Sequence, residues 1–131
     1  MQNDKRPLSP HLQVYRPQLT SMMSIAHRAS GAFLCAGGVL ITLGLLALAD
    51  SPGSWTTFLE FCNGWLGKLL LAAAGFSLIY HWLNGLRHLA WDSGHGLDIK
   101  STYASGHFVM AAFVVLAAAL VWFGFLQGRA S

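Results

Sequence analysis

Charged side chains are scarce in this 131-residue chain, which has only 8 lysines and arginines and 5 aspartates and glutamates. Charged residues make up 10% of the sequence and hydrophobic residues 54%, whereas a soluble domain carries about a quarter charged residues. This scarcity excludes an ordinary soluble domain, and the length leaves room for one small unit rather than two. We therefore expect an integral membrane protein surrounded by a lipid bilayer.

Cysteine is also scarce, and the basic residues form no cluster. Cys35 is expected in the middle of a helix and Cys62 near the start of one, so we expect free thiols rather than a disulfide or a metal site. The net charge of +3 would suit nucleic acid, but the basic residues are scattered at the edges of apolar runs, which argues against that partner. No apolar core follows Lys5 and Arg6, and the segment is not Arg- and Ser-rich, so neither a secretory signal nor an import leader is expected.

Three apolar stretches are long enough to cross a bilayer, for which about 20 residues suffice. They predict an all-α fold with transmembrane helices over residues 21–49, 61–91 and 106–127, joined by loops over 50–60 and 92–105. Residues 1–20 are polar and interrupted by three prolines, so they are expected to lie on the membrane surface. Residues 128–131 are expected to form a short tail.

The distribution of lysine and arginine predicts the orientation of these helices. The N-terminal segment and residues 87–104 share one side and carry most of the basic residues, whereas the 50–60 loop carries none. The positive-inside bias places the N-terminus in the cytoplasm or matrix and the C-terminus outside. Because no import leader is expected, the bacterial cytoplasmic membrane is favoured over the mitochondrial inner membrane.

His81 lies inside the second apolar stretch, where a histidine is costly to place and is therefore a functional candidate. Gly85, four residues later, clears the surface beside the imidazole, as a flat and bulky cofactor requires. Arg87 and His88 follow at the membrane edge, where positive groups can meet acidic substituents of that cofactor. We interpret His81 as an axial ligand to a haem iron held between helices. The alternative is a core histidine bonded to a helix carbonyl.

The second ligand of a bis-histidine haem is expected from another chain. Such a site needs two imidazoles at similar depth on facing helices. His88 shares a helix face with His81 and cannot bind the same iron from the opposite side. His27 is on another helix, but we place it nearer to the level of His88 than to that of His81. Three helices with small-residue faces also form a poor bundle alone, so a partner membrane subunit is expected to complete a larger helical bundle.

Ser24 and Arg28 form a second polar pair, one helical turn apart at the mouth of the first membrane helix. A hydroxyl and a guanidinium at this spacing can donate hydrogen bonds to a carbonyl oxygen or an anion. The alternative is that Arg28 extends toward lipid phosphate, which is ordinary for arginine at a membrane edge.

Two sequence blocks resemble the cytochrome b membrane subunit of succinate dehydrogenase. The first consists of RPLSPHL at residues 6–12, PQLT at 17–20 and SIAHRASG at 24–31. The second is HWLNGLRHLAWD at residues 81–92, which is similar to that family's histidine, glycine and arginine–histidine signature. The blocks lie on successive predicted helices in the family's order, so the resemblance covers nearly the whole chain.

The resemblance implies haem b, with His81 as one axial ligand to the iron and a histidine of a second small membrane subunit as the other. It implies ubiquinone binding near Ser24 and Arg28, and places His27 and Arg28 beside the haem propionates. It also implies an iron–sulfur subunit, which passes electrons to the quinone, and a flavoprotein subunit, which oxidises succinate. No activity is expected from this chain alone.

The resemblance also places His88 and Asp92 near the haem or the quinone. Two other functions are alternatives to a succinate dehydrogenase subunit. One alternative is the anchor subunit of a fumarate reductase, which can lack haem; the clearance at Gly85 beside His81 argues against a haem-free version. The other alternative is a small channel or transporter subunit, but the polar residues gather at one side of the membrane.

Overall fold

The computed structural model describes residues 17–130, with side chains as far as Gly124. Over these residues the chain forms four helices: α1 (Leu19–Asp50), α2 (Pro52–Asn63), α3 (Trp65–Asp92) and α4 (Ile99–Ala130). Three of them, α1, α3 and α4, are long and apolar enough to cross a membrane. The predicted all-α membrane fold with three spanning helices is therefore confirmed. Most of the expected surface segment over residues 1–20 lies outside the described residues.

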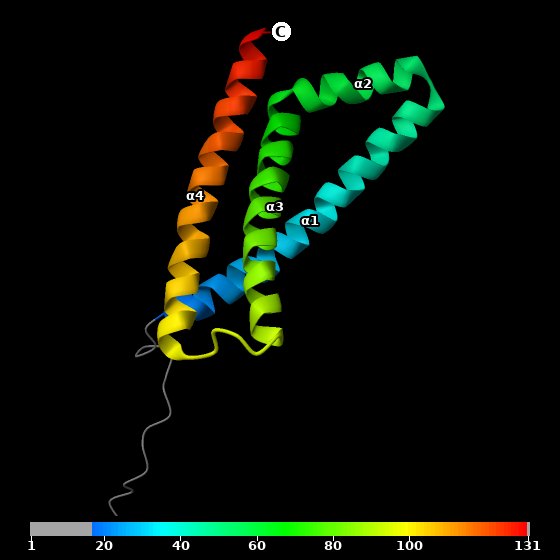
Figure 1. Cartoon of the computed structure of the whole chain (residues 1–131). Helices are drawn as coiled ribbons and strands as arrows, with labels where there is room; N and C mark the ends of the chain where they lie inside the picture. Colours follow the sequence, from blue (N-terminus) through cyan, green and yellow to red (C-terminus); the bar gives the residue numbers. More distant parts are fainter. Residues whose placement is uncertain (1–16, 131) are drawn as a thin grey trace, which may run out of the picture.

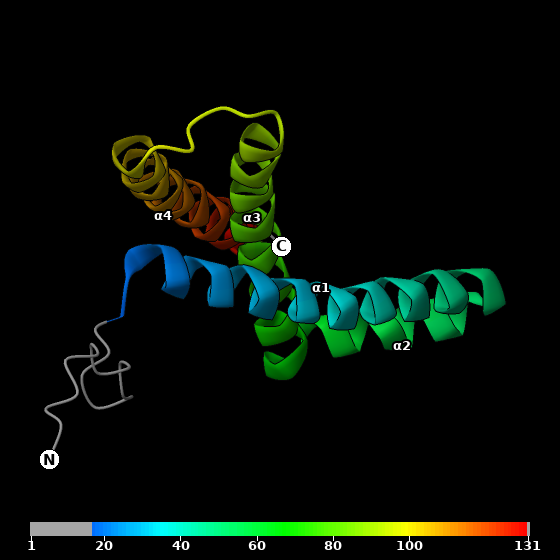
Figure 2. The same cartoon turned by 90° about the horizontal axis from the view of Figure 1, so that it is seen from below.

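The three long helices come together at one end, and toward the other end α1 diverges from α3 and α4. α4 runs alongside α3, whereas α1 crosses α3 obliquely (Figures 1 and 2). The start of α1, the end of α3 and the start of α4 therefore come together at what we name the converging end, the lower end in Figure 1. At the opposite end, α2 bridges the separated ends of α1 and α3. This arrangement brings the two sequence blocks of the predicted site close together.

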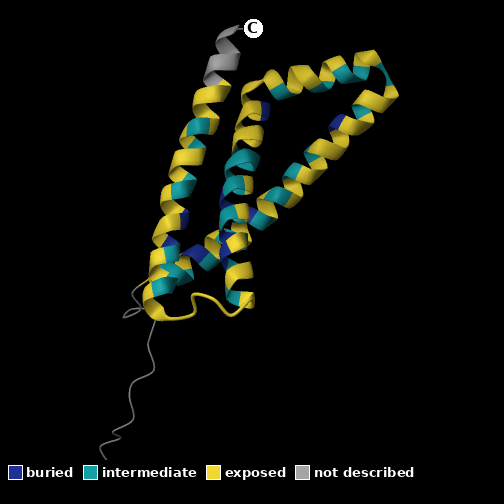
Figure 3. Cartoon of the chain, in the orientation of Figure 1, coloured by how far each residue is buried: buried dark blue, intermediate teal, exposed yellow. Residues whose placement is uncertain are grey.

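Most of the buried residues lie toward the converging end (Figure 3). They are small, polar or aromatic more often than aliphatic, and comprise Met23, Ser30, Tyr80, Asn84, Arg87, Gly106 and Val109. Large apolar side chains along the rest of the helices are exposed, as shown by Ile41 at 66% and Leu46 at 62%. The described chain thus has a small core of mixed polar and apolar side chains, and its apolar outer faces suit lipid or the helices of another subunit.

The expected loop over residues 50–60 is wrong, because most of it forms α2. Only Ser51 separates α1 from α2, with an extended backbone at φ −165° and ψ 159°. Its Oγ accepts a hydrogen bond from the Ser54 backbone N–H at 3.2 Å, which caps the new helix. Pro52 takes the first helical position, where its fixed φ is favourable and its missing N–H has no cost. The residues that end one helix therefore begin the next.

Two other predicted boundaries are also corrected. α3 begins at Trp65 rather than residue 61, because Gly64 takes an extended conformation between α2 and α3. α4 begins at Ile99 rather than residue 106, because the Asp98 carboxylate accepts the Ser101 backbone N–H at 3.0 Å. Hydrogen bonds from the Ser101 side chain and backbone also lower the pKa of the Asp98 carboxyl. The polar residues 99–105 are thus the first turns of a helix, and the inner loop shortens to residues 93–98.

Replacing Gly67 by alanine is expected to lower the melting temperature of the purified assembly by several degrees. A Cβ at Gly67 would collide with the backbone of Phe61 and Cys62, which cannot rotate away as a side chain can. Overpacking of this kind costs about 1–3 kcal/mol. Gly124→Ala is the matched control, since a Cβ there meets nothing within 4 Å. Equal melting temperatures for the two variants would contradict the close contact between α2 and α3.

Candidate functional site at the converging end

Three histidine rings stack across the interface between α1 and α3. The His27 ring is 4.0 Å from the His81 ring and 5.0 Å from the His88 ring, at interplanar angles of 12° and 13°. His81 and His88 are two turns apart on α3, about 10.5 Å of helix rise, which leaves room for one ring between them. We expected His27 nearer to the level of His88; its ring is stacked between the rings of His81 and His88, in contact with both.

The stacking also bears on whether His27 can be the second iron ligand. Two parallel rings 4.0 Å apart present their faces to each other, so their nitrogens do not point at a common atom between them. His27 and His81 therefore do not form an axial pair in this arrangement. The expectation that a second ligand comes from another chain is consistent with this geometry.

The Nδ1 atom of His81 is held by two groups of α1. It lies 3.1 Å from the His27 carbonyl oxygen and 3.1 Å from Ser30 Oγ. The Ser30 hydroxyl donates its own proton to the same carbonyl at 2.7 Å. Because a carbonyl only accepts, we assign the His81 proton to Nδ1, which leaves the lone pair of the neutral ring on Nε2. This is the usual arrangement of a metal-binding histidine, whose second nitrogen is oriented by a carbonyl or carboxylate.

Two glycines shape the surroundings of His81. A Cβ at Gly31 would lie 3.2 Å from His81 Cε1, so the absence of a side chain lets the imidazole approach α1. A Cβ at Gly85 would meet nothing within 4 Å, so the adjacent surface of α3 is open, as the sequence predicted. His27 Nδ1 is buried without a hydrogen-bond partner among the described residues. A free Nε2, an open surface and an unpaired polar atom together fit a planar cofactor ligated by His81.

Ser24 and Arg28 line a cavity of about 370 Å³, which we name the α1–α3 cavity. The Arg28 side chain folds back on the preceding turn, where Nε donates to the Ser24 carbonyl at 3.3 Å and Nη2 lies 3.5 Å from Ser24 Oγ. The volume falls in the range of small-molecule sites, about 300–1,000 Å³. The other lining residues are Thr20, Ser21, Ile25, Arg87, His88 and Trp91. The two predicted polar residues therefore share one cavity with His88.

Arg87 turns into the protein rather than toward the membrane edge. It is 7% exposed, and its Nε donates to Ser105 Oγ at 3.0 Å while Nη2 donates to the Thr102 carbonyl at 2.8 Å. Its guanidinium also lies 4.1 Å from the centre of the Trp91 ring. Arg87 thus ties α3 to α4, which sequence reasoning missed. Two of its acceptors, Thr102 and Ser105, lie in the stretch for which the sequence predicts a loop.

The remaining candidates have different surroundings. His88 Nδ1 donates to the Asn84 carbonyl at 2.8 Å, and its ring meets the edge of Trp91. Asp92 is exposed at the end of α3 and lines none of the cavities described here. Asn84 is fully buried, and its Nδ2 has no hydrogen-bond partner among the described residues. Its position between His81 and His88 on one helix face was a signal that sequence reasoning did not use.

These features define a multi-span helical membrane protein with a histidine-lined polar site where its helices converge. The chain belongs to the succinate dehydrogenase/fumarate reductase transmembrane subunit family, whose model matches residues 2–120. This confirms the family that the two sequence blocks suggested.

Several relatives are similar over most of this chain. It is 46% identical to the succinate dehydrogenase cytochrome b556 subunit of Paracoccus denitrificans over 112 residues, 86% of each chain. It is 37% identical to the corresponding subunit of Rickettsia felis over 120 residues, 91% of this chain and 92% of the relative. It is 42% identical to the mitochondrial cytochrome b560 subunit of Homo sapiens over 115 residues, 84% of this chain and 66% of the relative.

Proposed function

We propose that this membrane-anchor subunit of succinate dehydrogenase holds haem b through His81 and contributes Ser24 and Arg28 to a ubiquinone-reduction site. The observation that carries the haem assignment is the fixed Nδ1 of His81, because it leaves Nε2 free to bind iron. The names of the relatives, cytochrome b556 and cytochrome b560, support haem b as the group. The second axial ligand would be a histidine of a second small membrane subunit.

The residues of this chain would orient the cofactor and form part of its surroundings. Haem b, when bound, supplies a one-electron redox centre within the membrane. The His27 carbonyl and the Ser30 hydroxyl fix the His81 ring, and Gly85 leaves the adjacent helix surface open. His27, whose Nδ1 has no hydrogen-bond partner among the described residues, and Arg28 would face the propionates. A buried, hydrogen-bonded ligand is one of the features that set a haem potential.

Ser24 and Arg28 would bind the quinone ring in the α1–α3 cavity. Ubiquinone takes up two electrons and two protons to become ubiquinol, and negative charge develops on its carbonyl oxygens during the reaction. Preorganised donors stabilise that charge, and a serine hydroxyl and a guanidinium one turn apart provide them. The electrons would arrive from succinate through the flavoprotein and iron–sulfur subunits. His88 lines the same cavity and would contact the quinone or the haem, with Asp92 one turn beyond.

The two alternative functions are less well supported. The relatives are named for succinate dehydrogenase, which favours that complex over a fumarate reductase. A channel would need a polar path along the membrane normal. Among the described residues, the buried polar side chains are Ser30, in the first half of α1, and Asn84 and Arg87, near the end of α3.

A reduced-minus-oxidised optical spectrum tests the haem assignment. Membranes that contain this chain with its partner subunits are expected to show a b-type band, whereas membranes without the chain lack that contribution. If the complete complex shows no b-type haem, the proposal is wrong for this chain and a haem-free anchor is favoured.

We also propose which side of the membrane the converging end faces. Arg28, Arg87 and Lys100 lie at or near the converging end, so the positive-inside bias places that end, and the N-terminus, in the cytoplasm of a bacterium. A reporter fused after Ser131 is expected outside, and one inserted in the 93–98 loop inside. Reporters on the same side of the membrane would contradict the passage of α4 through the bilayer.

A further inference from the structure

Ser30 contacts both His27 and His81 where α1 meets α3. Its side chain is buried, and its Oγ lies 2.7 Å from the His27 carbonyl oxygen and 3.1 Å from His81 Nδ1. The carbonyl oxygen and His81 Nδ1 are themselves 3.1 Å apart. The three polar atoms therefore form a closed triangle that joins the two helices beside the His81 ring.

The direction of each hydrogen bond in this triangle follows from the donors available. A carbonyl oxygen only accepts, so the single hydroxyl proton of Ser30 goes to His27. Ser30 Oγ can then only accept from His81, and the Nδ1 proton is shared between the hydroxyl and the carbonyl. Both shared distances, 3.1 Å, lie at the long end of N–H···O hydrogen bonds, about 2.7–3.2 Å, as expected for one proton with two acceptors.

The hydroxyl links the imidazole to the carbonyl as a relay. It accepts from His81 and donates to His27, and consecutive hydrogen bonds in a low-dielectric interior polarise one another. Ser30 Oγ is therefore a better acceptor than an isolated hydroxyl. Acceptors on the ring proton of a metal-binding histidine fix the orientation of the ring and raise the basicity of its other nitrogen. In His81 that other nitrogen is Nε2.

We propose that Ser30 is a positioning residue that lowers the midpoint potential of the haem by acting through His81. This inference rests on the proposed binding of iron by His81 Nε2. A more basic Nε2 donates more electron density and stabilises ferric iron over ferrous iron, which lowers the potential. Hydrogen bonding around an axial ligand is one of the means by which a protein sets this potential.

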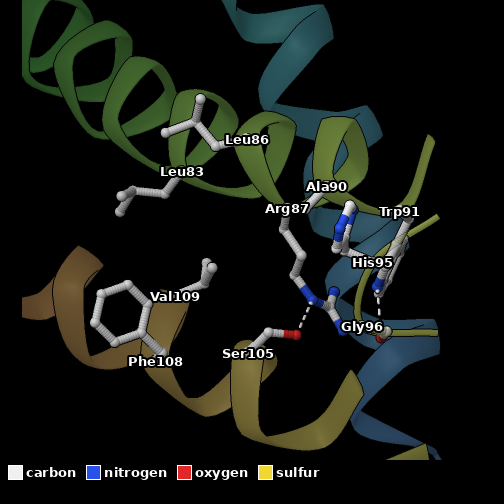
Figure 4. Close-up of a pocket in the computed structure, with 10 residues that line it drawn as sticks. All are labelled: Leu83, Leu86, Arg87, Ala90, Trp91, His95, Gly96, Ser105, Phe108 and Val109. Carbon is white, nitrogen blue, oxygen red and sulfur yellow. Dashed lines mark hydrogen bonds between the residues drawn. The ribbon is translucent and has the colours of Figure 1, made fainter. Parts of the chain in front are cut away.

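The chain contains a second serine with the same bonding pattern away from His81. Ser105 Oγ donates to the Thr102 carbonyl at 3.1 Å and accepts from Arg87 Nε at 3.0 Å (Figure 4). Arg87 Nη2 donates to the same carbonyl, so a serine, a carbonyl three residues earlier and a basic side chain of α3 again form a triangle. Ser105 borders a second cavity, of about 320 Å³, between α3 and α4. Ser105→Ala is therefore the matched control for Ser30→Ala.

A second control removes a hydrogen bond between the same two helices, α1 and α3. The buried Tyr80 hydroxyl donates to the Met23 carbonyl at 3.1 Å and takes no part in the triangle. Tyr80→Phe thus weakens the contact between α1 and α3 by one hydrogen bond, while both acceptors of His81 Nδ1 remain.

The test is a redox titration of the haem in the purified complete complex, with the electron paramagnetic resonance spectrum of the ferric haem as a second readout. Ser30→Ala is expected to raise the midpoint potential by roughly 30–60 mV, which corresponds to a change of roughly 3- to 10-fold in the ferric–ferrous equilibrium for one electron. The largest g value should also shift, because it depends on the angle between the axial ring planes and the His81 ring loses one of the bonds that fix it.

The other variants show whether the hydroxyl itself is responsible. Ser30→Thr keeps a hydroxyl that a helical threonine can turn to a carbonyl of the preceding turn, and it is expected to restore both values. Ser105→Ala and Tyr80→Phe are expected to keep the wild-type values. If Ser30→Ala loses the haem, Ser30→Cys is measured in its place, and its weakly accepting thiol is expected to shift the potential in the same direction.

Three results would overturn this role of Ser30. The first is a wild-type potential with wild-type g values in Ser30→Ala. The second is an equal shift in either control variant, which would assign the effect to looser helix packing. The third is failure of Ser30→Thr to restore the values, which would show that the hydroxyl is not what matters. A wild-type complex with no b-type band is a distinct outcome, because it contradicts the haem assignment itself.

Discussion

Replacing His81 by leucine is expected to abolish the b-type haem band while the chain still inserts into the membrane. Leucine has no nitrogen to bind iron, and it also loses the hydrogen bonds to the His27 carbonyl and Ser30. Insertion persists because α1 and α4 are unchanged and α3 becomes more apolar. The measurement is the reduced-minus-oxidised spectrum of purified membranes, normalised to the amount of chain detected by immunoblot.

His107→Leu is the control for this experiment. His107 is exposed on α4 and lines none of the cavities described here, so its replacement should leave the band at the wild-type intensity. A full haem spectrum in His81→Leu would show that iron is ligated elsewhere. His81 would then be a core histidine bonded to a helix carbonyl.

The second large effect concerns quinone turnover. Ser24→Ala removes a neutral donor, for which a loss of about 0.5–1.5 kcal/mol, or roughly 2- to 10-fold in rate, is expected. Arg28→Leu removes a charged donor, for which about 1.5–3 kcal/mol, or roughly 10- to 100-fold, is expected. Both variants should transfer electrons normally to an artificial acceptor that acts before the quinone, because neither residue lies on that part of the route.

The readout is the ratio of succinate:quinone reductase activity to artificial-acceptor activity in each variant. Ile25→Val is a suitable control, since it lines the same cavity without a polar group. A ratio at the wild-type value in both polar variants would mean that the quinone binds elsewhere. A fall in both activities together would indicate loss of assembly rather than loss of a quinone contact.

The three spans could be predicted because hydropathy over about 20 residues depends on local sequence alone. α2 and the start of α4 were missed for a different reason. Ser51–Pro52 and Asp98 are helix-start signals, but each lies in a polar stretch that also suits a loop. The polarity of these stretches favours a loop, but capping decides where a helix begins.

The candidate site was predictable only in its single-helix parts. The pair Ser24 and Arg28, and the open surface at Gly85 beside His81, follow from helical spacing, and the structure places them as expected. The stack of His27 between His81 and His88 depends on the angle at which α1 crosses α3, which spacing on one helix cannot give.

The burial of Arg87 was missed for a related reason. Its hydrogen bonds to Ser105 and Thr102 exist only because α4 starts early enough to present those residues to α3. If the inner loop is predicted to end at residue 105, Thr102 and Ser105 are not expected on a helix. Arg87, near the end of a membrane helix, is then expected at the membrane edge.

The most direct test of the central claim, that His81 Nε2 binds the haem iron, is the midpoint potential of the haem in His81→Met. Methionine keeps an axial ligand at the same position but replaces a nitrogen with a thioether, and the identity of the axial ligand sets the potential. We expect a haem that is retained in part, with a midpoint potential well above that of the wild type. A fully retained haem with the wild-type potential would contradict the claim, because the iron would then be indifferent to the side chain at this position.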